Sequence, residues 1–177
     1  MRRPGRIRAV VVAAALMALM APAAAFADVQ VSTDAHNDTG SSVDIWKVRV
    51  DNSTAHRSKV VVGVQQDRVR IGDSIDIFFD TRKRDPGPEF WLGAYVASEY
   101  LMRHAERWRD LGPPVNTGCG YRLRINERTD RSRAVVSRRC LGYPSKVRVA
   151  VKVTRGTPGT SHDWAKAPRT WLPWVRR

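Results

Sequence analysis

Beyond its first 27 residues, the chain of 177 residues has no long hydrophobic run and little cysteine. The longest purely aliphatic runs there are three residues, as at 60–62, whereas a membrane-spanning helix needs about 20 apolar residues, so we expect no membrane span after signal removal. Two cysteines exclude a disulfide-rich framework. Without a Cys-x-x-Cys motif, these cysteines also lack the usual spacing of thiol-redox and zinc sites.

The common hydrolase motifs are also missing. The chain has no Gly-x-Ser-x-Gly and no His-Glu-x-x-His sequence. The block Gly72-Asp73-Ser74 is similar to the nucleophile block of GDSL-type esterases, but there the serine opens a helix, whereas Ser74 opens a predicted strand. The aspartate that those enzymes have three residues before the catalytic histidine is absent before His36, His56, His104 and His162. We therefore expect no enzymatic activity and no cofactor.

Residues 1–27 have the three parts of an export signal. Four arginines precede an apolar core at residues 9–20, and Ala25-Phe26-Ala27 fits the small-residue cleavage motif. The core of 12 residues is too short for a permanent anchor, which needs about 20. We expect cleavage after Ala27 and secretion into an extracellular, oxidising compartment.

The chain has few acidic residues relative to its basic ones. Its formal net charge is +14, and loss of the four signal arginines leaves +10. A basic extracellular protein attracts anionic cell-envelope polymers and acidic glycans, although the same charge also keeps a secreted chain soluble. The predicted extracellular location argues against nucleic acid as the physiological target.

Alternating apolar and polar residues predict strands with one buried face. Residues 146–153 alternate four valines with charged side chains, and residues 44–50 place Trp46 among core valines. Further strands are predicted at residues 60–64, 74–80 and 90–97. About eight strands over residues 28–160 predict an all-β, two-sheet antiparallel sandwich. Residues 99–109 fit either a short helix or a strand.

The two cysteines bracket a predicted β-hairpin. Residues 121–125 and 134–138 alternate, with a polar turn between them. A turn centred between residues 129 and 130 pairs Leu123 with Val136 and brings Cys119 opposite Cys140. Because opposed strand residues lie close enough to be bridged, we expect a structural Cys119–Cys140 disulfide in an oxidising compartment.

A resemblance adds to this interpretation. Gly72-Asp-Ser-Ile-Asp-Ile-Phe-Phe-Asp80-Thr81, followed by Pro86-Gly-Pro-Glu89-Phe90, resembles a strand and turn of DOMON-like and family 9 carbohydrate-binding sandwiches. The bracketing cysteines and the ending Asp163-Trp164 to Trp174-Val175 resemble small secreted actinobacterial β-sandwich proteins. The resemblance implies a sandwich fold. The chain lacks the Met/His pair of haem-binding DOMON domains, and no ligand residues are transferred.

Two small-ligand sites are candidates. Carboxylates of Asp80, Asp85 and Glu89 can converge across one turn and form a calcium candidate. The alternative is ordinary ion pairing with the basic residues of the same turn, Arg82, Lys83 and Arg84. Trp46 and Trp91 are expected in the core. Residues 161–177 are expected to pack on the sandwich as a lid, or else to present a carbohydrate platform made of Trp164, Trp171 and Trp174.

The remaining candidate is a basic sheet face. Cations project from the polar sides of three predicted strands, and they share a face if those strands are neighbours. They are Lys47, Arg49, Arg122, Arg124, Arg148 and Lys152. The sequence thus predicts a secreted binding module for anionic polymers, with a calcium-assisted carbohydrate-binding module as the alternative and an extracellular hydrolase as a distant third.

Overall fold

The computed structural model of the protein describes residues 28–36, 38, 43–85, 87–156 and 161–177. The predicted export signal lies outside the described residues. Within them, no helix has the length and apolarity needed to cross a bilayer.

The fold is an all-β sandwich of two antiparallel sheets, as predicted. The five-stranded sheet has the order β1-β2-β3-β9-β8, and the seven-stranded sheet has the order β11-β10-β4-β5-β6-β7, with β12 also pairing to β10. The first sheet comprises β1 (Val29–Thr33), β2 (Ile45–Asp51), β3 (Lys59–Gln66), β8 (Tyr121–Asn126) and β9 (Arg131–Ser137). The second comprises β4 (Ser74–Asp80), β5 (Phe90–Tyr95), β6 (Tyr100–Arg107), β7 (Asp110–Pro114), β10 (Lys146–Arg155), β11 (Ser161–Trp164) and β12 (Val175–Arg176).

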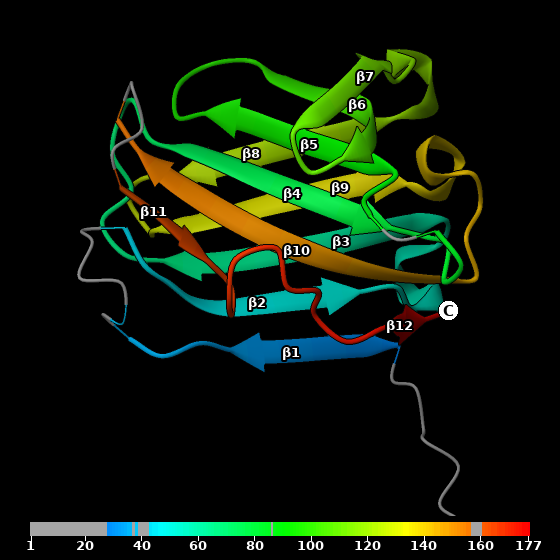
Figure 1. Ribbon diagram of the computed structural model, residues 1–177, viewed down its shortest axis with the longest axis horizontal. Helices are drawn as coiled ribbons and strands as arrows, with labels where there is room; N and C mark the ends of the chain where they lie inside the picture. Colours follow the sequence, from blue (N-terminus) through cyan, green and yellow to red (C-terminus); the bar gives the residue numbers. More distant parts are fainter. Residues whose placement is uncertain (1–27, 37, 39–42, 86, 157–160) are drawn as a thin grey trace, which may run out of the picture.

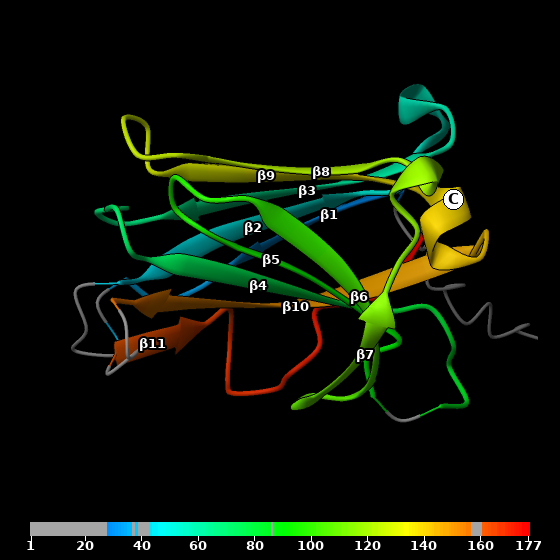
Figure 2. The same ribbon diagram turned by 90° about the horizontal axis from the view of Figure 1, so that it is seen from above.

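The two sheets form separate layers with the core between them (Figures 1 and 2). The valine side of β10 is fully buried and faces the five-stranded sheet, where the inward valines of β2 and β3 are equally inaccessible. Phe79 of β4 and Leu92 of β5 extend this core along the seven-stranded sheet. Since each sheet has one apolar face, burying both faces against each other removes the largest apolar area from water.

Residues 99–109 form a strand, so the helix alternative is wrong. Tyr100–Arg107 is β6, which pairs with β5 on one side and β7 on the other. Met102 is fully buried, whereas its neighbour Leu101 is 39% exposed. Pairing with β5 and β7 and the burial of alternate side chains outweigh the weak local helix propensity of this segment.

The predicted hairpin forms, but its predicted register is wrong by two residues. Leu123 pairs with Ala134, and Ile125 pairs with Ser132. The turn begins at Asn126, whose side-chain Oδ1 accepts hydrogen bonds from the backbone N–H groups of residues 128 and 129. Asp130 closes the turn with a left-handed φ of 51°. The capping side chain and the left-handed residue together shift the centre of the turn toward the N-terminus.

The predicted disulfide is present although its cysteines are not cross-strand partners. Cys119 ends the 3-10 turn η2 (Thr117–Cys119), and Cys140 lies in η3 (Arg138–Leu141). The two Cα atoms lie 5.2 Å apart across the open end of the hairpin. The bridge therefore joins two irregular segments that the strand ladder does not hold together.

Two tryptophans predicted for the core lie elsewhere. Trp46 is the extra residue of a β-bulge between Ile45 and Lys47, so its ring turns away from the inner face and packs against His36. Trp91 lies on the outer face of the seven-stranded sheet, where its indole N–H donates to Asp76 at 2.9 Å.

The C-terminal residues 161–177 fold back onto the seven-stranded sheet, as Figure 1 shows in red. β11 and β12 both pair with β10. Between them, the backbone N–H groups of Ala165 and Leu172 donate to carbonyls of Val151 and Val149. The segment is thus tied along the length of β10.

We predict that the Cys119→Ser, Cys140→Ala double variant loses about 3 kcal/mol of unfolding free energy in the chain-entropy model, because the bridge restricts the unfolded chain. The cysteines are 21 residues apart in the sequence. Urea denaturation measures the loss, and the wild-type protein treated with a reductant should match the variant. A midpoint equal to that of the oxidised wild type would contradict the prediction.

Candidate basic groove and tryptophan pocket

The outer face of the five-stranded sheet has two cross-strand rows of polar and basic residues. One row reads Arg49, Gly63, Arg133 and Arg124 across β2, β3, β9 and β8. The neighbouring row reads Lys47, Gln65, Arg131 and Asn126. With Arg122 farther along β8, six cations occupy this face, which we call the basic face.

Gly63 opens a hollow in the middle of the basic face. A Cβ at this position would have no atom within 4 Å, so the backbone between Arg49 and Arg133 lies bare. The resulting groove has a volume of about 330 Å³, and its walls include Lys47 and Arg131. Positive side chains therefore border the groove on both long sides.

A second, larger hollow of about 780 Å³ shares Arg131 and Arg133 with this groove. It lies between the β8–β9 hairpin and the turn that joins β5 to β6. Tyr95 and Tyr100 line it and are 50% and 37% exposed, respectively. Arg131 and Arg133 thus border both hollows, which we together call the track: cations line the groove, and Tyr95 and Tyr100 line the larger hollow.

The cations of the basic face are largely uncompensated. Only Arg49 has a carboxylate partner among the described residues, Asp51 at 2.9 Å. Within the same described part of the chain, no ion pair involves Lys47, Arg122, Arg124, Arg131 or Arg133. Arg124 and Arg133 are moreover directly opposed, an arrangement that repels unless an anion lies between the two charges.

The six cations predicted to share one face do not all share it. Arg148 and Lys152 belong to β10 and project from the outer face of the other sheet. There they pair with aspartates of β4: Arg148 lies 2.5 Å from Asp80, and Lys152 lies 4.0 Å from Asp76. Two arginines that the sequence analysis omitted, Arg131 and Arg133, complete the basic face instead.

The outer face of the seven-stranded sheet carries an aromatic pocket. Phe78 forms its floor and stacks against Trp164 at a ring-centroid distance of 5.8 Å, while Trp108 contacts both rings edge-on. Trp91 lies flat beside them because its strand neighbour Gly93 has no side chain. A Cβ on Gly93 would come within 2.2 Å of the Trp91 ring.

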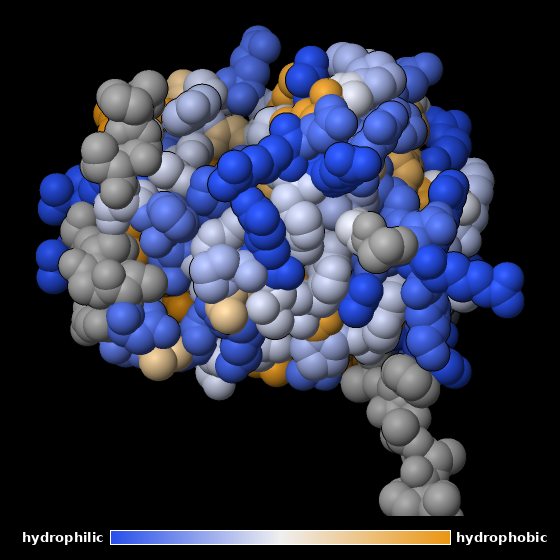
Figure 3. Space-filling model, in the orientation of Figure 1, coloured by the Kyte–Doolittle hydropathy of each residue, from blue (hydrophilic) through white to orange (hydrophobic). Residues whose placement is uncertain are grey.

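The aromatic pocket has a volume of about 550 Å³ and a polar rim. Asp76 lies at its inner end, where burial raises the pKa of its carboxyl even though the Trp91 N–H and Lys152 act in the opposite direction. His162, Arg109 and Arg169 also line the opening. Figure 3 looks onto this side of the molecule, which is mostly blue and pale with only small orange spots. The pocket is thus a local aromatic feature in a polar surface.

The three tryptophans of the predicted carbohydrate platform have different surroundings. Trp164 is 9% exposed and lines the aromatic pocket with Trp91 and Trp108. Trp171 packs on Trp108 at 4.6 Å, and Trp174 lies under the cations of Lys146 and Arg148. The three rings therefore do not form one flat platform.

The three calcium-candidate carboxylates are engaged by other groups. Asp80 is fully buried against Arg148, and Asp85 pairs with Arg82 at 3.4 Å. Glu89 accepts hydrogen bonds from the backbone N–H and the hydroxyl of Thr81. Asp85 matches the ion-pairing alternative, because Arg82 belongs to the same turn, whereas the partner of Asp80 is Arg148 of β10.

One buried carboxylate near the start of β2 titrates in an unusual range. Asp163 is 3% exposed, and its Oδ2 accepts a 2.6 Å hydrogen bond from the Ile45 N–H. Burial raises the pKa of its carboxyl to about 6, and the nearby Asp38 and Asp44 charges add to this rise. Between about pH 4 and about pH 6, the folded chain therefore holds a proton here that the unfolded chain has released.

No protein-family model matches the chain, and comparison with curated proteins and with solved structures returns no significant similarity. The resemblance to DOMON-like and family 9 carbohydrate-binding sandwiches accordingly stays a prediction.

We predict that stability falls as pH rises from about 4 to about 6, because in this window the folded chain binds the Asp163 proton more tightly than the unfolded chain, whose pKa is 3.8. The loss is at most about 3 kcal/mol. Asp163→Asn keeps an acceptor oxygen for Ile45 and removes the charge. In urea denaturation with a chelator present, the stability of this variant relative to the wild type should increase between about pH 4 and about pH 6 and stay constant above this range. A difference that is the same at all pH values would refute the assignment.

Proposed function

We propose that this protein is an exported binding module that holds an anionic polymer of the cell envelope, or an acidic glycan, on its basic face. The observation that carries the proposal is the difference between the two outer faces. Arg148 and Lys152 on β10 are neutralised by aspartates of β4, whereas five of the six cations on the basic face have no carboxylate partner within the described residues.

The spacing of these charges suits a repeating ligand. Neighbouring strands lie about 4.8 Å apart and alternate residues of one strand about 6.8 Å apart, so the basic face is a two-dimensional grid of positive charge. A polymer with a phosphate or carboxylate on each unit meets several cations at once. Each contact releases counterions, and the contacts together give strong binding from individually weak pairs.

The shape of the track adds a preference for sugar-containing polymers. The bare backbone at Gly63 lets a chain sink between Arg49 and Arg133. Beyond the arginines, the exposed rings of Tyr95 and Tyr100 offer apolar surfaces on which a sugar ring can lie. Teichoic-acid-like phosphates and uronate glycans combine both features.

We predict that Arg124→Glu with Arg133→Glu abolishes retention on heparin or teichoic-acid resin at 150 mM salt, a working concentration near the physiological ionic strength. The matched control is Lys83→Glu with Arg84→Glu, which makes the same change in net charge at exposed positions of the β4–β5 turn. The control should elute close to the wild type. Equal losses in both double variants would show attraction to net charge alone and would contradict a binding face.

Carbohydrate binding in the aromatic pocket is the second candidate. Three tryptophans and a half-buried carboxylate line one cavity, and carbohydrate sites typically combine ring stacking with an acceptor for sugar hydroxyls. The calcium part of this alternative gains no support from Asp80, Asp85 and Glu89, since the chain's own donors occupy their carboxylates.

We predict that Gly93→Ala removes binding of neutral oligosaccharides, because the added methyl group displaces the Trp91 ring and separates it from Asp76. Overpacking of this kind costs about 1–3 kcal/mol in stability. Gly63→Ala is the matched control, since its methyl group enters open space on the other sheet. The measurement is the glycan-array signal of the two variants; binding that survives Gly93→Ala would count against the pocket.

A further inference from the structure

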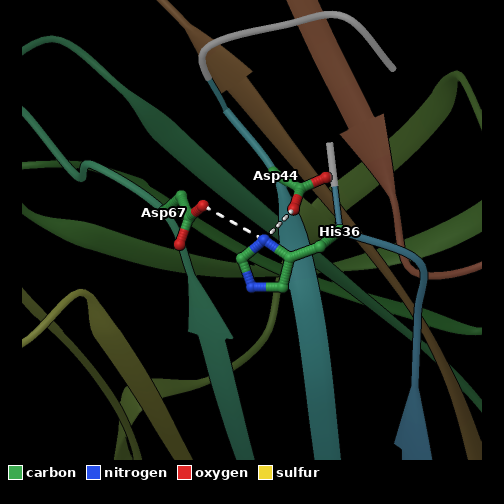
Figure 4. Close-up of side chains that lie close together, drawn as sticks. All are labelled: His36, Asp44 and Asp67. Atoms are coloured by element: carbon green, nitrogen blue, oxygen red, sulfur yellow. Dashed lines mark ion pairs between the residues drawn. The ribbon is translucent and has the colours of Figure 1, made fainter. Parts of the chain in front are cut away.

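Three metal-ligand side chains meet at the edge of the sandwich where β2 begins (Figure 4). His36 follows β1, Asp44 precedes β2 and Asp67 follows β3. The Nδ1 atom of His36 lies 3.5 Å from Asp44 Oδ2 and 3.5 Å from Asp67 Oδ2. One ring nitrogen and two carboxylate oxygens thus face one point, all within 4.8 Å of one another.

We propose that His36, Asp44 and Asp67 bind a divalent transition-metal ion of the zinc class. Zinc forms bonds of about 2.0–2.2 Å to imidazole nitrogen and carboxylate oxygen, and tetrahedral geometry then places ligand atoms about 3.4 Å apart. The two nitrogen–oxygen distances of 3.5 Å match this separation. All three ligand atoms lie within 4.8 Å of one another, so a small movement of the partly exposed Asp67 side chain completes the site around an ion.

The surrounding structure holds the ligands in place. Asp44 is 1% exposed, and its carbonyl accepts a 2.8 Å hydrogen bond from the Asp67 N–H, which fixes two ligands relative to each other. The bulge in β2 turns Trp46 toward His36, and the two rings pack at a centroid distance of 5.7 Å. The bulge thereby supports the third ligand.

The site is also open on one side. The His36 side chain is 52% exposed and that of Asp67 is 34% exposed, so an ion can enter and take a water molecule as its fourth ligand. Three protein ligands with one open position is the arrangement of zinc sites that remain accessible to a further ligand.

The charge and chemistry of the donors favour such an ion over the alternatives. Two carboxylates leave a net negative charge even when the imidazole is protonated. Calcium and magnesium prefer oxygen donors, whereas imidazole combined with carboxylates suits zinc and manganese. The site lies apart from the basic face and does not depend on the proposed function.

A second histidine–aspartate pair provides an internal contrast. His56 Nε2 lies 3.1 Å from Asp51 Oδ2, but the same oxygen accepts a 2.9 Å hydrogen bond from Arg49. One carboxylate is shared there between two cationic partners, and no second carboxylate from the described residues joins the group. His56 therefore serves as the matched control for His36.

The test is calorimetric titration of the chelator-treated chain, purified without a polyhistidine tag, with Zn²⁺, Mn²⁺ and Ca²⁺. We expect one Zn²⁺ per chain, weaker binding of Mn²⁺ and no binding of Ca²⁺. His36→Gln and Asp67→Asn should each weaken Zn²⁺ binding at least tenfold, whereas His56→Gln should bind like the wild type.

Near-ultraviolet circular dichroism checks that both ligand variants keep the native fold, which is expected because both side chains are partly exposed. Zinc should also raise the melting temperature of the wild type but not that of His36→Gln. Absence of Zn²⁺ binding by the wild type, unchanged affinity in His36→Gln, or equal affinity for Ca²⁺ would each overturn the proposal.

Discussion

The constraint on which this structure depends is the burial of the valine side of β10. Its four valines are at most 1% exposed and form the centre of the core between the sheets. Because consecutive side chains of a strand point to opposite faces, burying the valines forces Arg148 and Lys152 outward. The same strand pairs with β4, β11 and β12, so its position also determines where the C-terminal segment lies.

This constraint makes the two outer faces electrostatically different. On β10, the register with β4 places Arg148 opposite Asp80 and Lys152 opposite Asp76, so these two outward cations each meet an aspartate. On the five-stranded sheet, Gly63 and Gln65 of β3 separate the cations of β2 from those of β9 and contribute no carboxylate. Five uncompensated cations are therefore gathered on the basic face of the five-stranded sheet. That concentration, rather than the total charge, distinguishes a binding surface from a merely soluble one.

The fold class followed from alternation alone, because a period of two residues with one apolar side has few solutions other than a sandwich. Local features that the alternation does not encode determine the hairpin register and the direction of single side chains. The side chain of Asn126 and the left-handed Asp130 shifted the hairpin register by two residues, and a bulge turned Trp46 away from the core. The conformation of residues 99–109 was ambiguous because each side of the segment carries apolar residues, and only pairing with β5 and β7 determines which side is buried.

The candidate sites were harder to predict because they depend on strand order, which periodicity does not contain. Arg49 and Arg133 are 84 residues apart in the sequence, yet they flank the same glycine because β3 lies between β2 and β9. His36 and Asp44 lie in the connection between β1 and β2, Asp67 lies in the connection after β3, and no spacing in the sequence indicates that their atoms converge. One signal was nevertheless available: Gly63 interrupts an otherwise valine-rich strand, and a glycine in such a strand often marks a close approach of another molecule. In this sheet, that glycine is the point at which a bare backbone meets positive charge from both sides.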